Sequence, residues 1–340
     1  MSLPQLEKLR QVGAFDPTQP RERLSVWHVP FDTLCGDQRT ERALYEAIRT
    51  NGRVVVMGGS GSGKSSMLAW TFREEVLDLA LVRVPVSAED PTVVGEPGRF
   101  AAHLVQTVAR QARLLPKKDA RRFLDSTKRE SWTVAIRLGL PTWLATAGIS
   151  AEIQSVAERL PRSAADQIEI ASTLMKTISA KGLTPVLVVD DADLWLSGGD
   201  HDKLVNAFFT RVMRSMCDHL TVPIVVAAHR RYLELPGYQA ARGVLGTRID
   251  IPQIPLPGGV AKILAHRVRI ATEGQLADVM EDGAVAALAK VYEEGKGSLR
   301  YAMLVAQGAL VAAWGDKADS ITERQVTAAI AELGPTHWIT

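Results

Sequence analysis

The sequence has few cysteines, almost no net charge and no long apolar run. Its two cysteines, Cys35 and Cys217, lie far apart in a chain of 340 residues and in no metal-ligand spacing. We therefore expect no disulfide framework, no cysteine metal site and a reducing, cytoplasmic location. The net charge of +2 excludes a protein that binds polyanions over its whole surface, so any nucleic-acid contact must be local.

Targeting and membrane-spanning segments are missing as well. The N-terminal residues include Glu7, Lys8 and Arg10 and no apolar signal region, which argues against secretion. The most apolar long stretch, residues 132–149, is interrupted by an arginine, a glycine and a proline and is too broken for a transmembrane helix. There is no internal repeat or low-complexity tract. A composition of 46% hydrophobic and 23% charged residues is that of a globular protein with ample core.

A glycine-rich motif is the most informative feature that is present. Residues 58–65 fit G-x-x-x-x-G-K-[ST], the phosphate-binding Walker A loop, between an apolar strand and the start of a helix. Glycines let backbone N–H groups approach phosphates, and the helix N-terminus adds partial positive charge. Lys64 would reach the β- and γ-phosphates, and Ser65 would hold Mg²⁺. The candidate nucleotide-binding residues are Gly58, Gly59, Ser60, Gly61, Ser62, Gly63, Lys64, Ser65 and Ser66, and the predicted cofactors are ATP and Mg²⁺.

Two further apolar strands end in polar residues. Residues 186–189 are followed by Asp190 and Asp191, as in a Walker B segment. Asp190 would bind Mg²⁺, and Asp191 would orient or deprotonate the attacking water, with Asp193 a less favoured substitute. The next strand ends at His229, which would touch the γ-phosphate or the water.

The hydrophobic pattern predicts an α/β fold. Apolar strands alternate with helices, which indicates a parallel sheet covered on both faces. The strands are expected at 54–57, 79–86, 185–189 and 223–228, and the helices at 37–48, 99–114, 167–180 and 208–216. Four helices follow, at 260–270, 283–292, 298–314 and 322–333, and the last begins with a Thr322–Gln325 capping box. We expect an irregular N-terminal strap (1–35), a nucleotide-binding core (36–255) with an inserted segment near 110–155, and a helical lid (256–340).

The order of these features resembles that of an AAA+ ATPase. Within AAA+, the chain is most similar to the origin-recognition and cell-division-control initiator branch and its bacterial relatives, over residues 28–333. Residues 31–39 resemble the segment that leads into the first helix and lies near adenine in this branch. Residues 297–302 resemble its sensor 2 motif, which implies that Arg300 reaches back to the γ-phosphate.

The resemblance also implies that a neighbouring subunit supplies an arginine. Thr247-Arg248-Ile249 resembles the Ser-Arg finger segment, so Arg248 is the first candidate and Arg242 the second. Such an arginine stabilises charge on the transferring phosphoryl group. The expected assembly is a homo-oligomeric ring or filament.

Two features depart from the family pattern. Asp191 stands where the family has glutamate, as in STAND signalling ATPases, which turn over slowly as switches. The sequence ends at Thr340 after the lid, where initiators of this branch carry a winged-helix DNA-binding domain, and this counts against an origin-recognising role.

A basic run lies in the inserted segment. Residues 110–129 contain eight basic and two acidic residues, a local net charge of +6. Partial period-two alternation over residues 132–153 suggests a protruding hairpin beside it. The pair is a candidate contact for a DNA backbone. The alternative is a solvated helical face and a hairpin that packs on the next subunit. The nucleic-acid candidates are Lys117, Lys118, Arg121, Arg122, Lys128 and Arg129.

The predicted activity is ATP binding with slow hydrolysis, used as an oligomeric switch. In one interpretation the protein assembles on DNA and recruits a partner protein, as in transposition, recombination or replication. In a second it is a protein-directed switch in signalling or anti-phage defence and does not contact DNA. In a third it is a nucleotide-binding scaffold that never hydrolyses ATP. The basic run favours the interpretation with DNA. Asp191 and the missing winged-helix domain favour the two interpretations without it.

Overall fold

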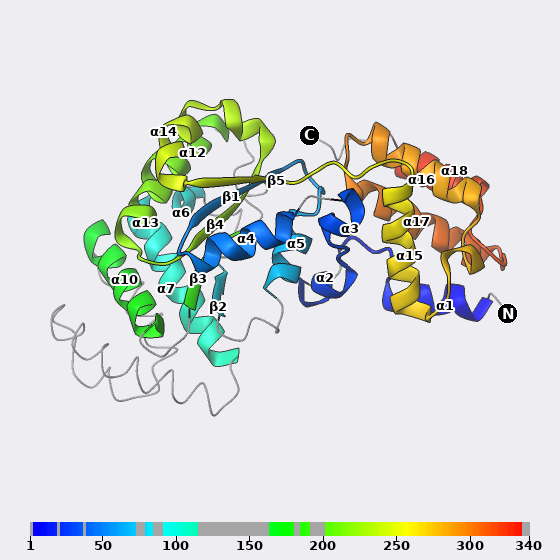
Figure 1. Cartoon of the computed structure of the whole chain (residues 1–340), viewed down its shortest axis with the longest axis horizontal. Helices are drawn as coiled ribbons and strands as arrows, with labels where there is room; N and C mark the ends of the chain where they lie inside the picture. Colours follow the sequence, from blue (N-terminus) through cyan, green and yellow to red (C-terminus); the bar gives the residue numbers. More distant parts are fainter. Residues whose placement is uncertain are drawn as a thin grey trace. The chain divides into compact units, whose positions relative to one another are not determined.

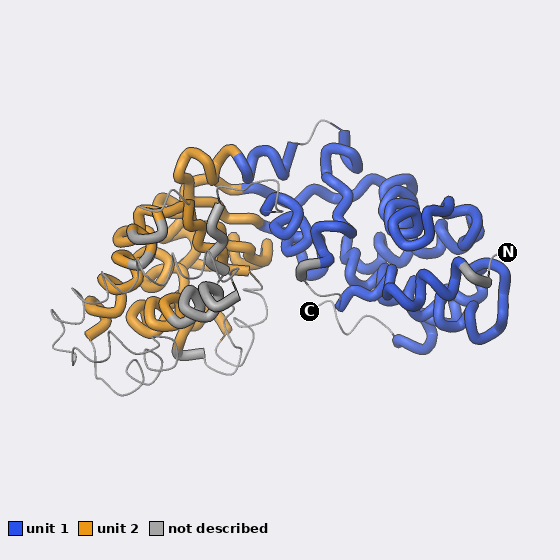
Figure 2. The backbone as a smooth tube through the Cα atoms, turned by 90° about the horizontal axis from the view of Figure 1, so that it is seen from below, with its two compact units in different colours: residues 1–45, 57–73, 249–340 blue, residues 46–56, 74–248 orange. Residues whose placement is uncertain are grey.

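The computed structural model of the protein describes residues 3–18, 21–36, 39–72, 79–83, 91–114, 163–179, 184–190 and 201–334. The chain forms two compact units, each built from segments that are far apart in the sequence (Figure 2). The first unit holds residues 1–45, 57–73 and 249–340, and the second holds residues 46–56 and 74–248. The predicted domain borders after residues 35 and 255 both fall inside the first unit, and the three-domain division stays a prediction.

A five-stranded sheet in the order β2-β3-β4-β1-β5 organises the fold (Figure 1). Its strands are β1 (Arg53–Gly58), β2 (Leu79–Arg83), β3 (Thr184–Val189), β4 (Ile224–His229) and β5 (Thr247–Asp250). β3 runs parallel to both β2 and β4, with Val188 opposite Val225. At the start of β4, Ile224 N donates to Gly52 O just before β1, so these two strands also begin together. The predicted parallel sheet is confirmed, and β5 is a strand that the sequence analysis did not predict.

The helices of the second unit cover this sheet. They are α6 (Pro91–Gly95), α7 (Pro97–Leu114), α10 (Ala164–Ser179), α12 (His201–Ala207), the π-helical η2 (Phe208–Met213), α13 (Arg214–His219), the 3₁₀-helical η3 (Arg230–Glu234) and α14 (Pro236–Leu245). Phe208 and Phe209 of η2 are fully buried, and the Phe208 ring meets the Phe100 ring of α7 edge-on. α4 (Thr40–Arg49) precedes β1 and fits the helix predicted over 37–48.

The N-terminal segment is helical, so the expectation of an irregular strap is wrong. It forms α1 (Leu3–Val12), α2 (Arg21–Trp27) and α3 (Phe31–Cys35). Leu6 and Leu9, three residues apart on α1, are fully buried, because a spacing of three places them on one helix face. The Pro and Asp content that suggested irregular structure lies between the helices and at their starts.

The C-terminal part of the first unit contains the four predicted lid helices. They are α15 (Gly258–Thr272), α16 (Asp282–Glu294), α17 (Leu299–Gly315) and α18 (Glu323–Leu333), with the short 3₁₀ helix η4 (Leu276–Asp278) between the first two. The predicted capping box at the start of α18 is confirmed, since Thr322 N donates to Gln325 Oε1 at 2.8 Å.

The predicted hairpin and most of the basic run, residues 115–155, lie outside the described residues. In the part of the chain that is described, no helix is long and apolar enough to cross a membrane.

Candidate nucleotide-binding site

The Walker A loop joins β1 to α5 (Lys64–Thr71), and the loop and α5 belong to the first unit. Gly61 and Gly63 have φ values of +70° and +100°, and residues that carry a Cβ rarely adopt such values. Gly61 is also tightly packed, because a Cβ there would lie 2.6 Å from Ser298 Oγ and 2.7 Å from Arg300 Cβ. By contrast, a Cβ on Gly59 would meet nothing within 4 Å. The start of α17 therefore fills the space beside Gly61, whereas the space beside Gly59 is free for a side chain.

Lys64 is held by the carbonyls of its own loop. Its side chain is buried, and Nζ donates to Gly58 O at 3.0 Å and to Gly59 O at 2.9 Å. Both acceptors are backbone carbonyl oxygens. Beside it, the hydroxyl of Ser62 is buried with no hydrogen-bond partner among the described residues. A buried polar group without a partner needs a water or a ligand, and a phosphate group supplies acceptors.

The start of the predicted sensor 2 helix lies directly on this loop. Arg300 N donates to Gly61 O at 3.3 Å. Ser298 is the N-cap of α17, and its Oγ accepts a hydrogen bond from Tyr301 N at 3.4 Å. A Cβ on Gly63 would lie 3.9 Å from Leu299 Cδ1. The structure thus brings the Gly-x-x-Arg segment to the Walker A loop, with the Arg300 side chain exposed.

The remaining predicted residues belong to the second unit. Asp190 directly follows β3 and is 5% exposed. His229 is the last residue of β4 and half-buried, and its Nδ1 accepts a hydrogen bond from Arg231 N at 3.1 Å. A neutral imidazole with Nδ1 as acceptor carries its proton on Nε2, so that nitrogen is a donor. Asp191 and Asp193 lie outside the described residues.

The two candidate finger arginines are both at the surface. Arg248 lies on β5 and Arg242 on α14, and both are exposed. The six basic residues proposed to contact nucleic acid, from Lys117 to Arg129, fall in a part of the chain that the structure does not describe.

The two cysteines, which are not predicted site residues, both have raised pKa values. Burial raises the pKa of the Cys217 thiol to about 11, although nearby Arg53 opposes the shift. Burial also raises the pKa of Cys35. Both thiols are therefore protonated at neutral pH and poor nucleophiles. Over the described ranges there is no group of three His, Cys, Asp or Glu side chains that could hold a metal ion on its own.

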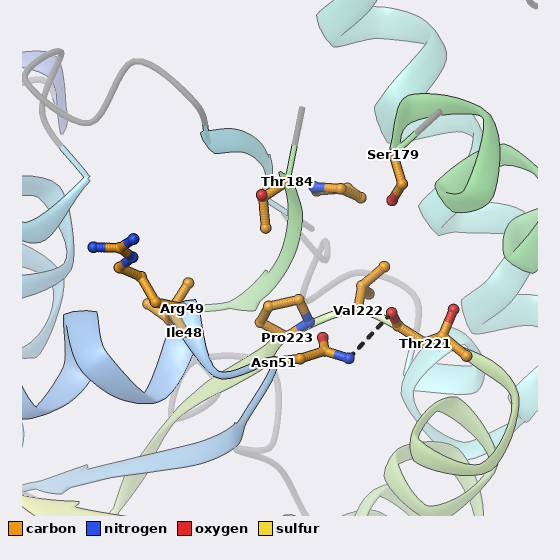
Figure 3. A pocket seen from close by; sticks show the side chains of 9 residues that line it. Ile48, Arg49, Asn51, Ser179, Thr184, Thr221, Val222 and Pro223 are labelled. Atoms are coloured by element: carbon orange, nitrogen blue, oxygen red, sulfur yellow. Dashed lines mark hydrogen bonds between the residues drawn. The ribbon is translucent and has the colours of Figure 1, made fainter. Parts of the chain in front are cut away.

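A cavity of about 360 Å³ lies in the second unit (Figure 3). Asn51, Thr184 and Pro223 line it, and Asn51 Nδ2 donates to the backbone oxygen of Thr221, another lining residue, at 3.4 Å. Thr184 begins β3 and Pro223 precedes β4, whereas Asp190 and His229 stand at the opposite, carboxyl ends of these strands. The cavity is therefore not part of the predicted nucleotide site.

One residue beside the loop is missing from the sequence motifs. His28 contacts Ser66 of α5 at 3.0 Å. No sequence pattern marks it, since its partners are 38 and 13 residues away along the chain.

Comparison with known proteins identifies solved structures that share this fold. The chain matches no family model and no curated protein sequence. Among solved structures it is similar to the ORC2 protein of Aeropyrum pernix, solved as ADPNP–ADP complexes, with a TM-score of 0.56 and 14% identity over 91% of this chain and 71% of that one. It is also similar to the Aeropyrum pernix ORC1 protein in complex with DNA, with a TM-score of 0.51 and 16% identity over 93% of this chain and 71% of that one. The chain therefore has the fold of the ORC proteins, the AAA+ initiators that its sequence motifs resemble.

Proposed function

We propose that the protein binds ATP with Mg²⁺ and hydrolyses it slowly, as an ATP-controlled oligomeric switch. The observation that carries the proposal is the Walker A loop itself. Two glycines there adopt left-handed backbone, a buried lysine ammonium stands over the loop carbonyls, and the N-terminus of a second helix closes one side. Backbone N–H groups, a lysine and a helix N-terminus in this order form a phosphate site.

The residues divide the work as follows. Lys64 would exchange part of its carbonyl contacts for phosphate oxygens, and Ser65 and Asp190 offer the oxygen ligands that Mg²⁺ prefers. Bound Mg²⁺ would neutralise charge on the phosphates. Asp191 would accept a proton from the attacking water. His229, with its proton on Nε2, would donate a hydrogen bond to the γ-phosphate or the water, and Arg300 would contact the γ-phosphate.

The nucleotide site is tested by replacing its lysine. Lys64→Ala removes charge-assisted hydrogen bonds to phosphate, so ATP binding should weaken by about 10- to 100-fold in equilibrium titrations. Lys290→Ala is the matched control, because Lys290 is an exposed helix lysine paired with Glu294 at 3.7 Å. Equal affinity of wild type and Lys64→Ala for ATP would refute the phosphate-loop assignment.

We further propose that the switch assembles on DNA and recruits a partner protein. The local charge of +6 over residues 110–129 supports this proposal. A second support is that a protein of the same fold, ORC1 of Aeropyrum pernix, has a structure in complex with DNA. The competing proposal is a protein-directed, STAND-like switch without DNA contact, which the aspartate pair Asp190–Asp191 favours. Salt-dependent DNA binding separates the two.

A further inference from the structure

Two buried side chains, His28 and Glu41, and the half-buried Ser66 form a hydrogen-bonded chain beside the Walker A helix, all within the first unit. The side chains of His28 and Glu41 are only 4% and 5% exposed. Glu41 Oε1 accepts from His28 Nε2 at 2.8 Å and from Phe31 N at 2.9 Å. The other ring nitrogen, His28 Nδ1, lies 3.0 Å from Ser66 Oγ. We call His28, Glu41 and Ser66 the His28 relay.

The carboxylate of Glu41 fixes the direction of one hydrogen bond in the relay. An ionised carboxylate only accepts, so His28 Nε2 must carry a proton to donate to Glu41. Nδ1 accepts from the Ser66 hydroxyl when the ring is neutral and donates to Ser66 Oγ when the ring is an imidazolium, and in both forms this bond joins the two side chains. Glu41 thereby sets the ring tautomer, and the ring sets the orientation of the Ser66 side chain.

The relay connects the N-terminal segment to the phosphate loop. Ser66 lies in the first turn of α5, whose backbone N–H groups would face a bound phosphate, and its hydroxyl ties this turn to His28. His28 directly follows α2 and Phe31 is the first residue of α3. α2 packs against α5. The His28 ring lies 5.6 Å from the Phe31 ring and 5.8 Å from the Trp70 ring. Phe31 also approaches the loop directly, because a Cβ on Gly63 would lie 3.5 Å from Phe31 Cζ.

We propose that His28 is a positioning residue for the nucleotide: it acts through Ser66, and it couples phosphate binding to the packing of residues 28–36. This inference rests on the proposed ATP site. Such a coupling is reciprocal, because two events that share one structural element stabilise each other by the same free energy. A ligand bound at the first turn of α5 therefore protects the amides of residues 28–36 from hydrogen exchange. Loss of His28 lowers the affinity for that ligand, although His28 does not touch it.

The affinity test uses His28→Phe, Ser66→Ala and the double variant. Phenylalanine keeps a ring between Phe31 and Trp70 and removes both hydrogen bonds. His28→Phe should weaken ADP binding about three- to tenfold in calorimetric titrations, the effect of a lost buried hydrogen bond. The double variant should bind ADP no more weakly than Ser66→Ala alone, because His28 acts through that hydroxyl. The matched control is His266→Phe, which removes a bond from α15 to Val26 O at 3.0 Å and should leave ADP affinity unchanged.

The second measurement is hydrogen exchange at the Phe31 amide, whose acceptor is Glu41. Pyrophosphate is the probe, because it fills a phosphate site and has no base that could touch residues 31–36 directly. Pyrophosphate should slow exchange of this amide at least about threefold in wild type and in His266→Phe. Protection should be absent in Ser66→Ala, which deletes only a hydroxyl and keeps the helix. This variant therefore tests the relay even where His28→Phe fails to fold.

Several outcomes overturn the inference. Wild-type ADP affinity in a folded His28→Phe would do so, as would additive losses in the double variant or full protection of the Phe31 amide in Ser66→Ala. In each of these cases a Lys64-dependent ATP site still stands. If wild type binds neither ADP nor pyrophosphate, the proposed function fails and the inference falls with it.

Discussion

At the residue scale, Gly61 is the glycine of the Walker A loop that packs against the start of α17. Its left-handed backbone and its contact with the start of α17 both exclude a Cβ. Strain of this kind costs about 1–3 kcal/mol per residue. Gly61→Ala should lower the free energy of unfolding by at least about 1 kcal/mol, measured by urea titration without nucleotide, and should also weaken ATP binding.

Gly59→Ala is the matched control for this change. A Cβ on Gly59 would meet nothing within 4 Å, and its φ is not positive. The variant should therefore retain the free energy of unfolding within about 0.5 kcal/mol. Equal stability of Gly61→Ala and Gly59→Ala would show that the contact between the loop and α17 is not tight in solution.

At the element scale, the N-terminus of α17 has a structural and a functional role that can be separated. Ser298 caps α17 beside the loop, and Thr322 caps α18 through its capping box. Replacing an N-cap Ser or Thr by Ala costs about 1 kcal/mol. Both Ser298→Ala and Thr322→Ala should therefore lower the free energy of unfolding, measured with a chemical denaturant, by about 1 kcal/mol. Only Ser298→Ala should also bind ATP more weakly.

The comparison of the two caps controls for the general loss of stability. If both variants weaken ATP binding equally, the effect comes from a less stable lid and not from the contact between α17 and Gly61. If neither does, the placement of the predicted sensor 2 segment beside the phosphate loop has no role in binding.

Elements with local signals were predictable from the sequence. The Thr322–Gln325 capping box, the apolar strands β1, β3 and β4 and the four lid helices were predicted within a few residues, because their signals lie within one or two turns of chain. β5 was missed, since it has four residues of which only Ile249 is buried. The helices α1 to α3 were missed because proline and charged residues obscured the apolar spacing of Leu6 and Leu9.

The resemblance to initiators predicted that Arg300 approaches the phosphate site, but the individual contacts between distant segments could not be predicted. The bond from Arg300 N to Gly61 O joins a loop to a helix near the other end of the chain. The His28 relay likewise joins three segments. Such contacts depend on how the helices pack, and a single sequence carries no signal for this. The motifs named the candidate residues, and the structure shows which of them lie together in the first unit.

At the scale of the whole molecule, we propose that a second subunit completes the nucleotide site. An arginine supplied in trans stabilises charge on the transferring phosphoryl group. ATP turnover per subunit should therefore rise with protein concentration. Arg248→Ala should lower the rate of ATP hydrolysis at least about 100-fold and retain ATP binding. The reason is that arginine fingers raise the turnover rate about 10³- to 10⁵-fold.

Arg242→Ala is the comparison for this change, because Arg242 is a second exposed arginine. Loss of turnover in Arg242→Ala alone would move the finger to α14. A strictly monomeric protein with full, concentration-independent turnover would rule out the completed site.

The basic run decides between a switch on DNA and one directed at proteins. If residues 110–129 contact a phosphate backbone, affinity for duplex DNA should fall with salt on a log–log slope of about −0.9 per contact. Replacing Lys117, Lys118, Arg121 and Arg122 with Ala should flatten that slope by up to about 3 to 4 units and leave ATP binding intact.

A matched variant removes the same charge elsewhere, with Ala at Lys8, Lys203, Lys290 and Arg324, four exposed helix residues. Its slope should stay close to that of wild type, because charge outside the DNA contact releases no condensed counterions. Equal flattening in both variants would mean that the protein attracts DNA only through its overall charge. Absence of DNA binding by wild type at low salt with ATP present would leave the protein-directed switch as the surviving proposal.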